Sequence, residues 1–255
     1  MCGRYTIFIP LDELIRHFRL EQAEEFEPRY NIAPTQTVPV IRQEDGKRSL
    51  RLLRWGLVPF WADDSSIGNR LINARAESVS SKPSFRTAFL NRRCIMPASG
   101  FFEWKEQKKG PKRPYFIKRK DGTPMAFAGL WERWQGKDGG EKRETFTIIT
   151  TDANEDVKGL HNRMPVILEP ENYSLWLNTE QPDREALNKM MCPAAPGTLT
   201  AHPVSKYVNS PTNEGKQCIK SIEIVCGICG ERFLVDGPAG TIARCPSCGT
   251  GNMVG

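Results

Sequence analysis

Residues 38–55 read VPVIRQEDGKRSLRLLRW and carry the signal that decides the fold class. Val38 to Arg42 and Leu50 to Trp55 are rich in apolar residues, and Glu44-Asp45-Gly46-Lys47 lies between them. An Asp-Gly pair between two such runs is typical of the turn of a β-hairpin. The sequence therefore predicts two antiparallel strands in this region.

The same pattern returns further along the chain, where Tyr115 to Lys118 and Met125 to Leu130 flank Lys120-Asp121-Gly122-Thr123, and it predicts a second hairpin. Further strand-like runs are Cys94 to Met96, Thr145 to Thr150 and Met164 to Leu168. Short helices are expected at Leu11 to Phe18, Ser84 to Leu90, Glu155 to Leu160, Glu171 to Leu177 and Asp183 to Met191. Because the strands do not alternate strictly with helices, we expect an α+β protein with a mostly antiparallel, barrel-like sheet and short peripheral helices.

The composition indicates a folded, weakly basic protein. Of 255 residues, 36 are Lys or Arg and 30 are Asp or Glu, which gives a formal net charge of +6, and 39% are hydrophobic. This hydrophobic content excludes a wholly disordered chain. No apolar run approaches the roughly 20 residues that span a bilayer, and Met1 to Arg4 lead into Tyr5 without a signal segment. We therefore expect a cytoplasmic protein, and the charge hints at a polyanionic partner.

The eight cysteines are distributed unevenly along the chain. Four of them form two Cys-x-x-Cys pairs separated by fifteen residues, namely Cys226, Cys229, Cys245 and Cys248. This spacing is typical of tetrahedral thiolate zinc sites. We expect residues 222–255 to form a zinc-ribbon-like module, appended to a main domain of residues 1–220, in which a structural Zn²⁺ supplies the folding energy. The alternative is four reduced thiols on a loose tail.

Cys2 directly follows the initiator methionine. Removal of Met1 would give Cys2 a free α-amine and a thiol on adjacent carbons. The amine, with a pKa of about 7.7–8.0, can condense with an aldehyde to an imine, and the thiol, with a pKa of ~8.5, can then close a five-membered thiazolidine ring. Ring closure makes the adduct more durable than an imine. The alternative is a cysteine that happens to occupy position 2.

Seven segments occur in this order: Met1-Cys2-Gly3-Arg4-Tyr5, Asn31-Ile32-Ala33-Pro34-Thr35, Trp55-Gly56-Leu57-Val58-Pro59-Phe60-Trp61, Asn73-Ala74-Arg75-Ala76-Glu77, Pro97-Ala98-Ser99-Gly100-Phe101-Phe102-Glu103-Trp104, Ala128-Gly129-Leu130-Trp131-Glu132 and His161-Asn162-Arg163-Met164-Pro165. Together they closely resemble the SRAP family, the abasic-site processing proteins that shield abasic sites in single-stranded DNA. The resemblance runs to about residue 220 and leaves out the cysteine-rich module. It implies that Cys2 attacks the ring-opened aldehyde of an abasic deoxyribose and ends as a thiazolidine crosslink to DNA, without a cofactor.

The family positions that assist this reaction map onto Asn73, Glu103 and His161. The resemblance implies that Asn73 holds the amine or a sugar hydroxyl and that His161 exchanges a proton with the sugar oxygen. Glu103 would shuttle protons, because its apolar neighbours Phe102 and Trp104 should raise its pKa. Each residue also has an ordinary structural alternative: a turn residue, an ion-pair partner and a structural histidine.

The DNA-binding candidates lie in or beside these segments. They are Arg4, Arg75 and Arg163 for the phosphates, Trp61 and Trp104 for the bases, and Thr150 for a hydroxyl contact at the end of a strand. Planar guanidinium groups suit phosphate oxygens, and aromatic rings bind single-stranded bases by stacking. For the arginines the alternative is surface solvation, and for the tryptophans it is the core.

The sequence leaves alternative functions open. The family's removal of its own N-terminal residues implies a peptidase-like activity of Cys2 and Glu103, for which a host methionine aminopeptidase is the alternative. Class II glutamine amidotransferase domains also begin with Met-Cys-Gly, but we find no glutamine-pocket motif or synthase domain. A non-enzymatic DNA-binding adaptor is a third reading. The zinc module is a candidate contact for a replication or repair protein, and the sequence leaves the oligomeric state open.

Overall fold

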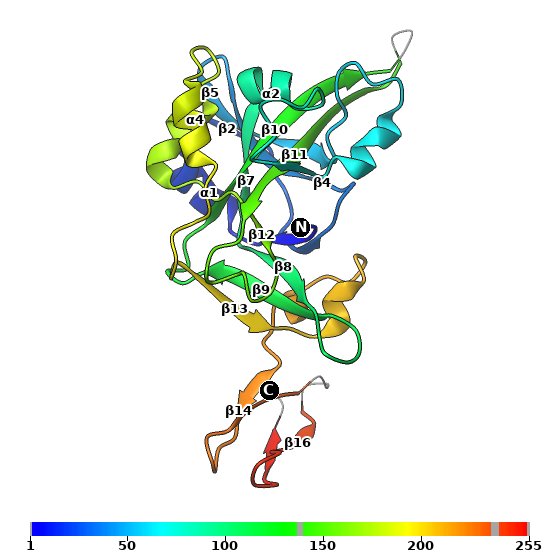
Figure 1. The fold of residues 1–255 in the computed structure, drawn as a ribbon, viewed down its shortest axis with the longest axis vertical. Coiled ribbons are helices and arrows are strands. Elements are labelled where there is room, and N and C mark those ends of the chain that lie inside the picture. Colours follow the sequence, from blue (N-terminus) through cyan, green and yellow to red (C-terminus); the bar gives the residue numbers. More distant parts are fainter. Residues whose placement is uncertain (1, 137–139, 236–239, 254–255) are drawn as a thin grey trace.

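The main body is built around a closed five-stranded barrel (Figure 1). The computed structural model describes residues 2–136, 140–235 and 240–253. The barrel strands are β4 (Thr37–Glu44), β5 (Lys47–Trp55), β7 (Arg93–Ala98), β10 (Met125–Gln135) and β11 (Lys142–Asp152). Neighbours pair antiparallel in the order β11-β10-β7-β4-β5, and a parallel pairing of β5 with β11 closes the ring. Closure leaves no free edge among these strands.

A second, five-stranded sheet lies below the barrel in Figure 1. Its strands, in spatial order, are β13 (Leu199–Pro203), β9 (Arg113–Arg119), β8 (Gly100–Lys105), β1 (Tyr5–Ile7) and β3 (Arg29–Ile32). One face of this sheet sends Tyr5, Phe101 and Ile117 into the barrel core, and the other packs Phe102 and Phe116 against Val204 and Val208. The start of β1 therefore lies where the two layers meet.

Short elements complete the main body. Three short strands join the barrel sheet: β2 (Gln22–Ala23), β6 (Asn73–Arg75) and β12 (Arg163–Pro165). The helices are α1 (Leu11–Phe18), α2 (Arg86–Asn91), α3 (Tyr173–Leu177) and α4 (Arg184–Met190), with 3₁₀ turns at Ser65–Arg70, Pro170–Asn172, Lys206–Asn209 and Lys216–Cys218. The predicted α+β class, with a mostly antiparallel barrel-like sheet and short helices, is confirmed. In the described ranges, no helix has the length and apolarity needed to span a bilayer.

The first predicted hairpin is confirmed by the pairing of β4 with β5. Its register runs from Thr37 opposite Arg54 to Glu44 opposite Lys47. Asp45 (φ 49°) and Gly46 (φ 78°) both adopt the left-handed region, as a tight two-residue hairpin turn requires.

The second predicted hairpin is wrong, although its turn forms. The side chain of Asp121 accepts a hydrogen bond from the backbone N–H of Thr123 (3.0 Å), which bends the chain as expected. The flanking strands then separate: β9 pairs with β8 and β13, whereas β10 pairs with β7 and β11. The turn passes the chain from one sheet to the other, and a local turn signal does not reveal which partner a strand takes.

The helix expected at Glu155 to Leu160 is also wrong, because tight turns replace it. The N–H of Lys158 donates to the carbonyl of Asn154 (2.9 Å), and the N–H of Ala153 donates to the carbonyl of Asn162 (3.1 Å). The second bond closes the segment into a loop that returns the chain from β11 to β12. A helix here would carry the chain away from that strand.

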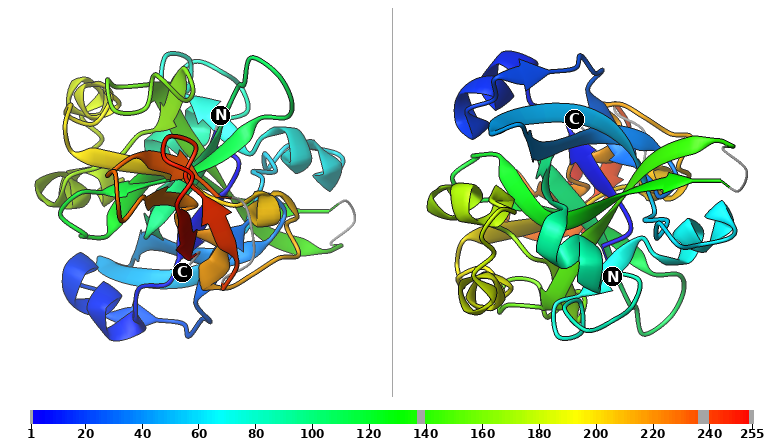
Figure 2. Two further views of the ribbon diagram at one scale, coloured as in Figure 1. Left: turned by 90° about the horizontal axis from the view of Figure 1, so that it is seen from below. Right: turned by 90° about the horizontal axis from the view of Figure 1, so that it is seen from above.

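The cysteine-rich segment forms two small hairpins apart from the barrel (Figure 1). In them, β14 (Glu223–Val225) pairs with β15 (Arg232–Leu234), and β16 (Ile242–Arg244) pairs with β17 (Gly251–Met253). Viewed from below, this segment lies in front of the main body (Figure 2). Its connection is fixed by backbone hydrogen bonds, from Ile222 N–H to the Pro203 carbonyl (3.0 Å) and from Val235 N–H to the Ile222 carbonyl (2.7 Å).

Candidate active site and metal site

Cys2 lies in the core at the junction of the two layers, and Gly3 and Arg4 connect it to β1. Its side chain is fully buried, and its backbone carbonyl accepts a hydrogen bond from Asn73 Nδ2 (3.0 Å). Asn73 begins β6, which pairs with β11 through Asn73 opposite Ile148. Two residues predicted to act together are therefore in direct contact, and Asn73 fixes the backbone of Cys2.

Glu103 lies beside the same N-terminal segment. In the pairing of β1 with β8, Tyr5 is opposite Phe101, and the N–H of Phe102 donates to the Arg4 carbonyl (2.9 Å). Continuing this register places Glu103 next to Gly3. Glu103 is 3% exposed, and this burial raises the pKa of its carboxyl to about 7.

The thiol of Cys2 is neutral near pH 7. Burial raises the pKa of the Cys2 thiol well above its usual range, and the nearby Glu103 carboxylate raises it further. A carboxyl with a pKa of about 7 is present in both its protonated and its ionised form near neutral pH, so Glu103 can donate or accept a proton beside the thiol. The expectation that apolar surroundings raise the pKa of Glu103 agrees with this geometry.

His161 lies in the loop between β11 and β12. Its Nδ1 accepts a hydrogen bond from the backbone N–H of Arg163 (2.9 Å), so we assign the proton of the neutral ring to Nε2. Burial lowers the pKa of His161, and the positive charge of Lys112 lowers it further. The charge of Lys112 also acts on Glu103. The positive charge of Lys112 therefore acts on both His161 and Glu103.

The three predicted arginines differ in how free they are. Arg75 is exposed on β6. Arg163 instead pairs with Glu77 and Asp152 (each 2.7 Å) and donates to the Thr150 carbonyl (2.6 Å). This pairing holds the pKa of the Glu77 carboxyl below its usual value. Of Arg75 and Arg163, Arg75 is therefore the one with an exposed side chain.

Arg4 is held mainly by the protein itself. Its Nη1 donates to Asn31 Oδ1 (2.6 Å) and to the Val208 carbonyl (2.8 Å). Its guanidinium lies 5.7 Å from the ring centroid of Trp104, and Trp104 Nε1 donates to Asn209 Oδ1 (2.8 Å). The structure thus joins Arg4 and Trp104 into one partly buried unit.

The remaining two candidates lie at opposite extremes of exposure. Trp61 is 49% exposed, as expected for a ring that contacts bases. Thr150 is fully buried, and its hydroxyl donates to the Ala74 carbonyl (3.4 Å). The hydroxyl of Thr150 is therefore turned into the protein instead of toward the surface, because it faces the neighbouring strand β6.

The sequence reasoning missed three polar residues that organise the site. Buried Asn31 donates through Nδ2 to the carbonyls of Val208, Ser210 and Asn213, which ties the segment after β13 to β3. Glu77 and Asp152 hold Arg163, as described above. Asn31 and Glu77 lie in two of the seven segments that resemble the SRAP family, 31–35 and 73–77, and this position could have marked them as site residues.

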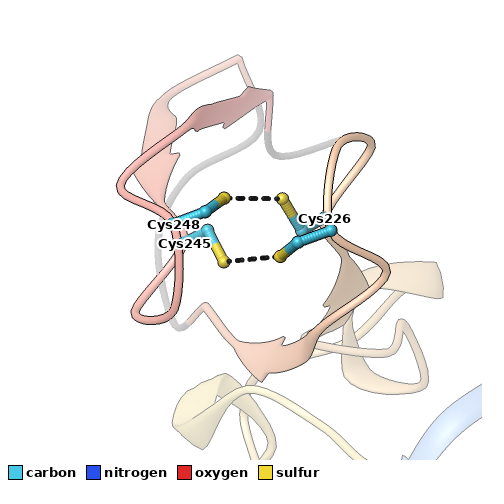
Figure 3. A group of neighbouring side chains, drawn as sticks. Cys226, Cys245 and Cys248 are labelled. Atoms are coloured by element: carbon cyan, nitrogen blue, oxygen red, sulfur yellow. Dashed lines mark hydrogen bonds between the residues drawn. The ribbon is translucent and has the colours of Figure 1, made fainter.

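The four clustered cysteines form a site that could hold a metal ion. Their sulfur atoms all lie within 4.8 Å of one another, and Cys226 Sγ is 3.6 Å from Cys248 Sγ (Figure 3). Four thiolates about 2.3 Å from a tetrahedral zinc would be ~3.8 Å apart, so the donor set fits zinc. Each Cys-x-x-Cys turn ends in a left-handed glycine, Gly230 or Gly249 (both φ 73°).

Comparison with known proteins identifies the family. The family model "SOS response associated peptidase (SRAP)" matches residues 1–211. The chain belongs to the SRAP family. Abasic site processing protein YoqW of Bacillus subtilis is 43% identical over 224 residues, which cover 87% of this SRAP chain and all of YoqW. Abasic site processing protein HMCES of Gallus gallus is 37% identical over a gapped alignment of 268 positions, which covers 88% of this chain and 79% of HMCES.

A solved structure also shares this SRAP fold. A Bacteroides thetaiotaomicron protein is 27% identical, with a TM-score of 0.78, and the match covers 86% of this chain and 99% of the other. The resemblance inferred from the seven segments is thus confirmed. The cysteine-rich hairpins lie beyond the 1–211 range of the SRAP model.

Proposed function

We propose that this SRAP protein senses abasic sites in single-stranded DNA and forms a thiazolidine crosslink through Cys2 once Met1 has been removed. Met1 itself lies outside the described residues. The observation that carries the proposal is that Asn73 and Glu103 lie beside Cys2, near the N-terminus. The Glu103 carboxyl next to the thiol has a pKa of about 7. Relatives named abasic site processing proteins support the choice of lesion.

The proposed reaction condenses the residue with the sugar aldehyde. The free amine of Cys2 attacks the aldehyde carbon of the ring-opened deoxyribose, and loss of water gives an imine. The thiol sulfur then adds to the imine carbon, and its proton passes to nitrogen, which closes the thiazolidine with net loss of one water. Protonated Glu103 donates to the departing oxygen, and its carboxylate then accepts the thiol proton. His161, protonated on Nε2, exchanges a proton with the sugar ring oxygen.

Met1 must leave before this chemistry can begin. Hydrolysis of the bond between Met1 and Cys2 consumes one water, and we propose that Cys2 and Glu103 take part in it as a peptidase-like activity. Asn73 would hold the Cys2 carbonyl during this step, as it does in the structure. A host methionine aminopeptidase is the alternative route.

We further propose which residues contact DNA and where the protein acts. Exposed Arg75 would bind a phosphate beside the lesion, and Arg163 would join it by exchanging one carboxylate partner for phosphate. Trp61 would stack on a neighbouring base. The unit of Arg4 and Trp104 would line the opposite side of the site. We place the protein in the cytoplasm with the DNA.

The module of residues 222–255 is proposed as a separate folding unit from residues 1–220, with one structural Zn²⁺ held by its four cysteines. Zinc binding would supply the folding energy that so small a core lacks. A replication or repair protein is the partner proposed for this module.

The proposal is tested by denaturing gel electrophoresis of Met1-processed protein incubated with an abasic single-stranded oligonucleotide. We expect a heat-stable shifted band for the wild type and for Cys192→Ser, which removes an exposed thiol. We expect no band for Cys2→Ala. A band of undiminished intensity for Cys2→Ala would refute the role of Cys2, and glutamine hydrolysis in its place would favour an amidotransferase.

A further inference from the structure

Phe60 and Trp61 form an exposed aromatic pair in a loop, with 54% and 49% of their surfaces exposed. The loop leaves the barrel after Trp55 and returns at Leu71, where the N–H of Leu57 donates to the Leu71 carbonyl (3.2 Å). Asn73 follows two residues later. The aromatic pair and the residue that contacts Cys2 therefore belong to one continuous segment.

The end of the β10–β11 hairpin holds the backbone of this loop at alternate residues. Thr145 Oγ1 accepts a hydrogen bond from Val58 N–H (2.9 Å). The backbone N–H of Phe60 lies near the Glu132 carboxylate, and Trp134 Nε1 donates to the Ala62 carbonyl (2.7 Å). Residues 58 and 62 are thus hydrogen-bonded to the hairpin, and residue 60 between them lies near a buried carboxylate of the same hairpin.

These three side chains are themselves fixed. Glu132 is directly opposite Thr145 in the strand register, and Glu132 pairs with Arg92 (2.8 Å). Thr145 is fully buried, Glu132 is 3% exposed and Trp134 is 6% exposed. Large aromatic rings are exposed to solvent while the backbone beneath them is held by buried groups. A loop with this arrangement is rigid before a partner arrives, so binding costs little ordering entropy.

We propose that Thr145, Glu132 and Trp134 are positioning residues for DNA binding, which hold the loop so that Phe60 and Trp61 stack on the bases beside the abasic nucleotide. The proposal rests on the proposed function only for the identity of the ligand as abasic single-stranded DNA. Stacking on a base contributes about 1–3 kcal/mol. Loosening the loop should therefore weaken DNA binding and leave the crosslinking chemistry intact.

The test measures affinity separately from chemistry. The probe is a single-stranded oligonucleotide with a tetrahydrofuran residue at the lesion, which has no aldehyde and cannot crosslink, and binding is followed by fluorescence anisotropy. Thr145→Val removes the acceptor for Val58 and keeps the side-chain volume. Trp134→Phe removes the donor to Ala62. The matched control is Thr147→Val, because Thr147 is buried on the same strand and its hydroxyl has no partner among the described residues.

We expect Thr145→Val and Trp134→Phe each to weaken binding by about three- to tenfold, the effect of a lost hydrogen bond. Thr147→Val should bind like the wild type. When the oligonucleotide carries a true abasic site, the DNA concentration that gives half of the maximal crosslinking rate should rise by the same factor for the two variants. The maximal crosslinking rate should stay unchanged. In a Trp61→Ala background, Thr145→Val should have little further effect, because the positioned ring is gone.

Wild-type affinity in Thr145→Val and Trp134→Phe proteins that retain their melting temperature would overturn the proposal. An equal loss in the Thr147→Val control would also overturn it, because the effect would then be general to the barrel. Failure of the proposed chemistry gives a different pattern, in which the wild type forms no crosslink but the affinity differences on the tetrahydrofuran probe persist.

Discussion

At the scale of single residues, the account depends on a buried carboxyl beside a buried thiol. Cys2 and Glu103 are 0% and 3% exposed, so both groups favour their neutral forms. A carboxyl with a pKa of about 7 can donate or accept a proton near neutral pH. The same burial has a thermodynamic consequence, because Glu103 keeps its proton in the folded state at a pH where it loses it in the unfolded state.

Replacing Glu103 by Gln should change how stability depends on pH. The carboxyl pKa rises from its ordinary 4.5 to about 7 on folding. The contribution of Glu103 to the free energy of unfolding is therefore fully present below pH 4.5 and is lost as pH rises through 7. Between pH 5 and pH 8, the free energy of unfolding of the wild type should fall by on the order of 2 kcal/mol more than that of Glu103→Gln. Urea unfolding at both pH values measures this difference.

The control for this prediction is Glu25→Gln, which changes an exposed carboxyl and should keep the wild-type pH dependence. The idea fails if Glu103→Gln unfolds with the same pH dependence as the wild type. In the same variant, the crosslinking rate should lose its dependence on a group of pKa about 7.

Several residues of the site were predictable, and their partners were not. Cys2 was suggested by its adjacent amine and thiol, whereas Asn73 and Glu103 were suggested by their positions in the segments that resemble the SRAP family. The inward turn of the Thr150 hydroxyl and the double pairing of Arg163 depend on which strands β11 meets. Sequence reasoning had placed both side chains at the surface because it lacked those long-range contacts.

At the scale of elements, three strands assemble the edge that we propose contacts DNA. In the barrel sheet, β11 pairs with β6 on one side and β12 on the other, with Arg75 opposite Thr150 and Arg163 opposite Asp152. This pairing places Arg75, Arg163 and the carboxylates of Glu77 and Asp152 on neighbouring strands. In the structure, the positive charge of Arg163 is balanced by Glu77 and Asp152.

Replacing Arg75 and Arg163 by Ala should have unequal effects on binding to single-stranded DNA. Arg75→Ala should lower the slope of log affinity against log salt by ~0.7, the value for one lost phosphate contact, and leave stability unchanged. Arg163→Ala should cost more affinity at low salt, because it also leaves Glu77 and Asp152 without their cation. Anisotropy titrations over a range of salt concentrations measure both effects.

Arg16→Ala provides the charge-matched control for these titrations, because Arg16 lies on α1 and pairs with exposed Asp12. Its salt slope should equal that of the wild type. A wild-type slope for Arg75→Ala would remove Arg75 from the DNA contacts.

Among the elements, the two Asp-Gly turns show what local sequence can predict. Both turns form, and the first also joins paired strands, because β4 and β5 are adjacent in the barrel. The second connects two sheets, and each of its strands finds two other neighbours. A turn depends on a few adjacent residues and can be predicted from local sequence, whereas the pairing of strands depends on packing between distant segments.

At the scale of the whole molecule, the chain combines an SRAP domain with two cysteine-rich hairpins that lie apart from its core. The domain is held by a barrel and a second sheet that share one apolar core. The hairpins expose large apolar side chains such as Ile228 and Met253, at 77% and 75%. We therefore propose that so small a unit needs a bound metal to stay folded.

Changing Cys226 and Cys229 to Ser should abolish metal binding and unfold only the hairpins. Metal analysis should find one zinc per chain in the wild type and none in the variant. Limited proteolysis should then cut the variant within residues 222–255, while the melting temperature of the main domain stays unchanged. Cys192→Ser should behave like the wild type. Equal protease resistance of the metal-free hairpins would contradict a structural role for the metal.

The most direct test of the account is the intact mass of the product formed with abasic single-stranded DNA, measured without any reducing agent. We expect one species with the mass of the chain without Met1 plus the oligonucleotide minus one water, and peptide mapping should place the DNA on Cys2. A product that forms only after borohydride reduction, or that maps to a lysine, would contradict a thiazolidine at Cys2.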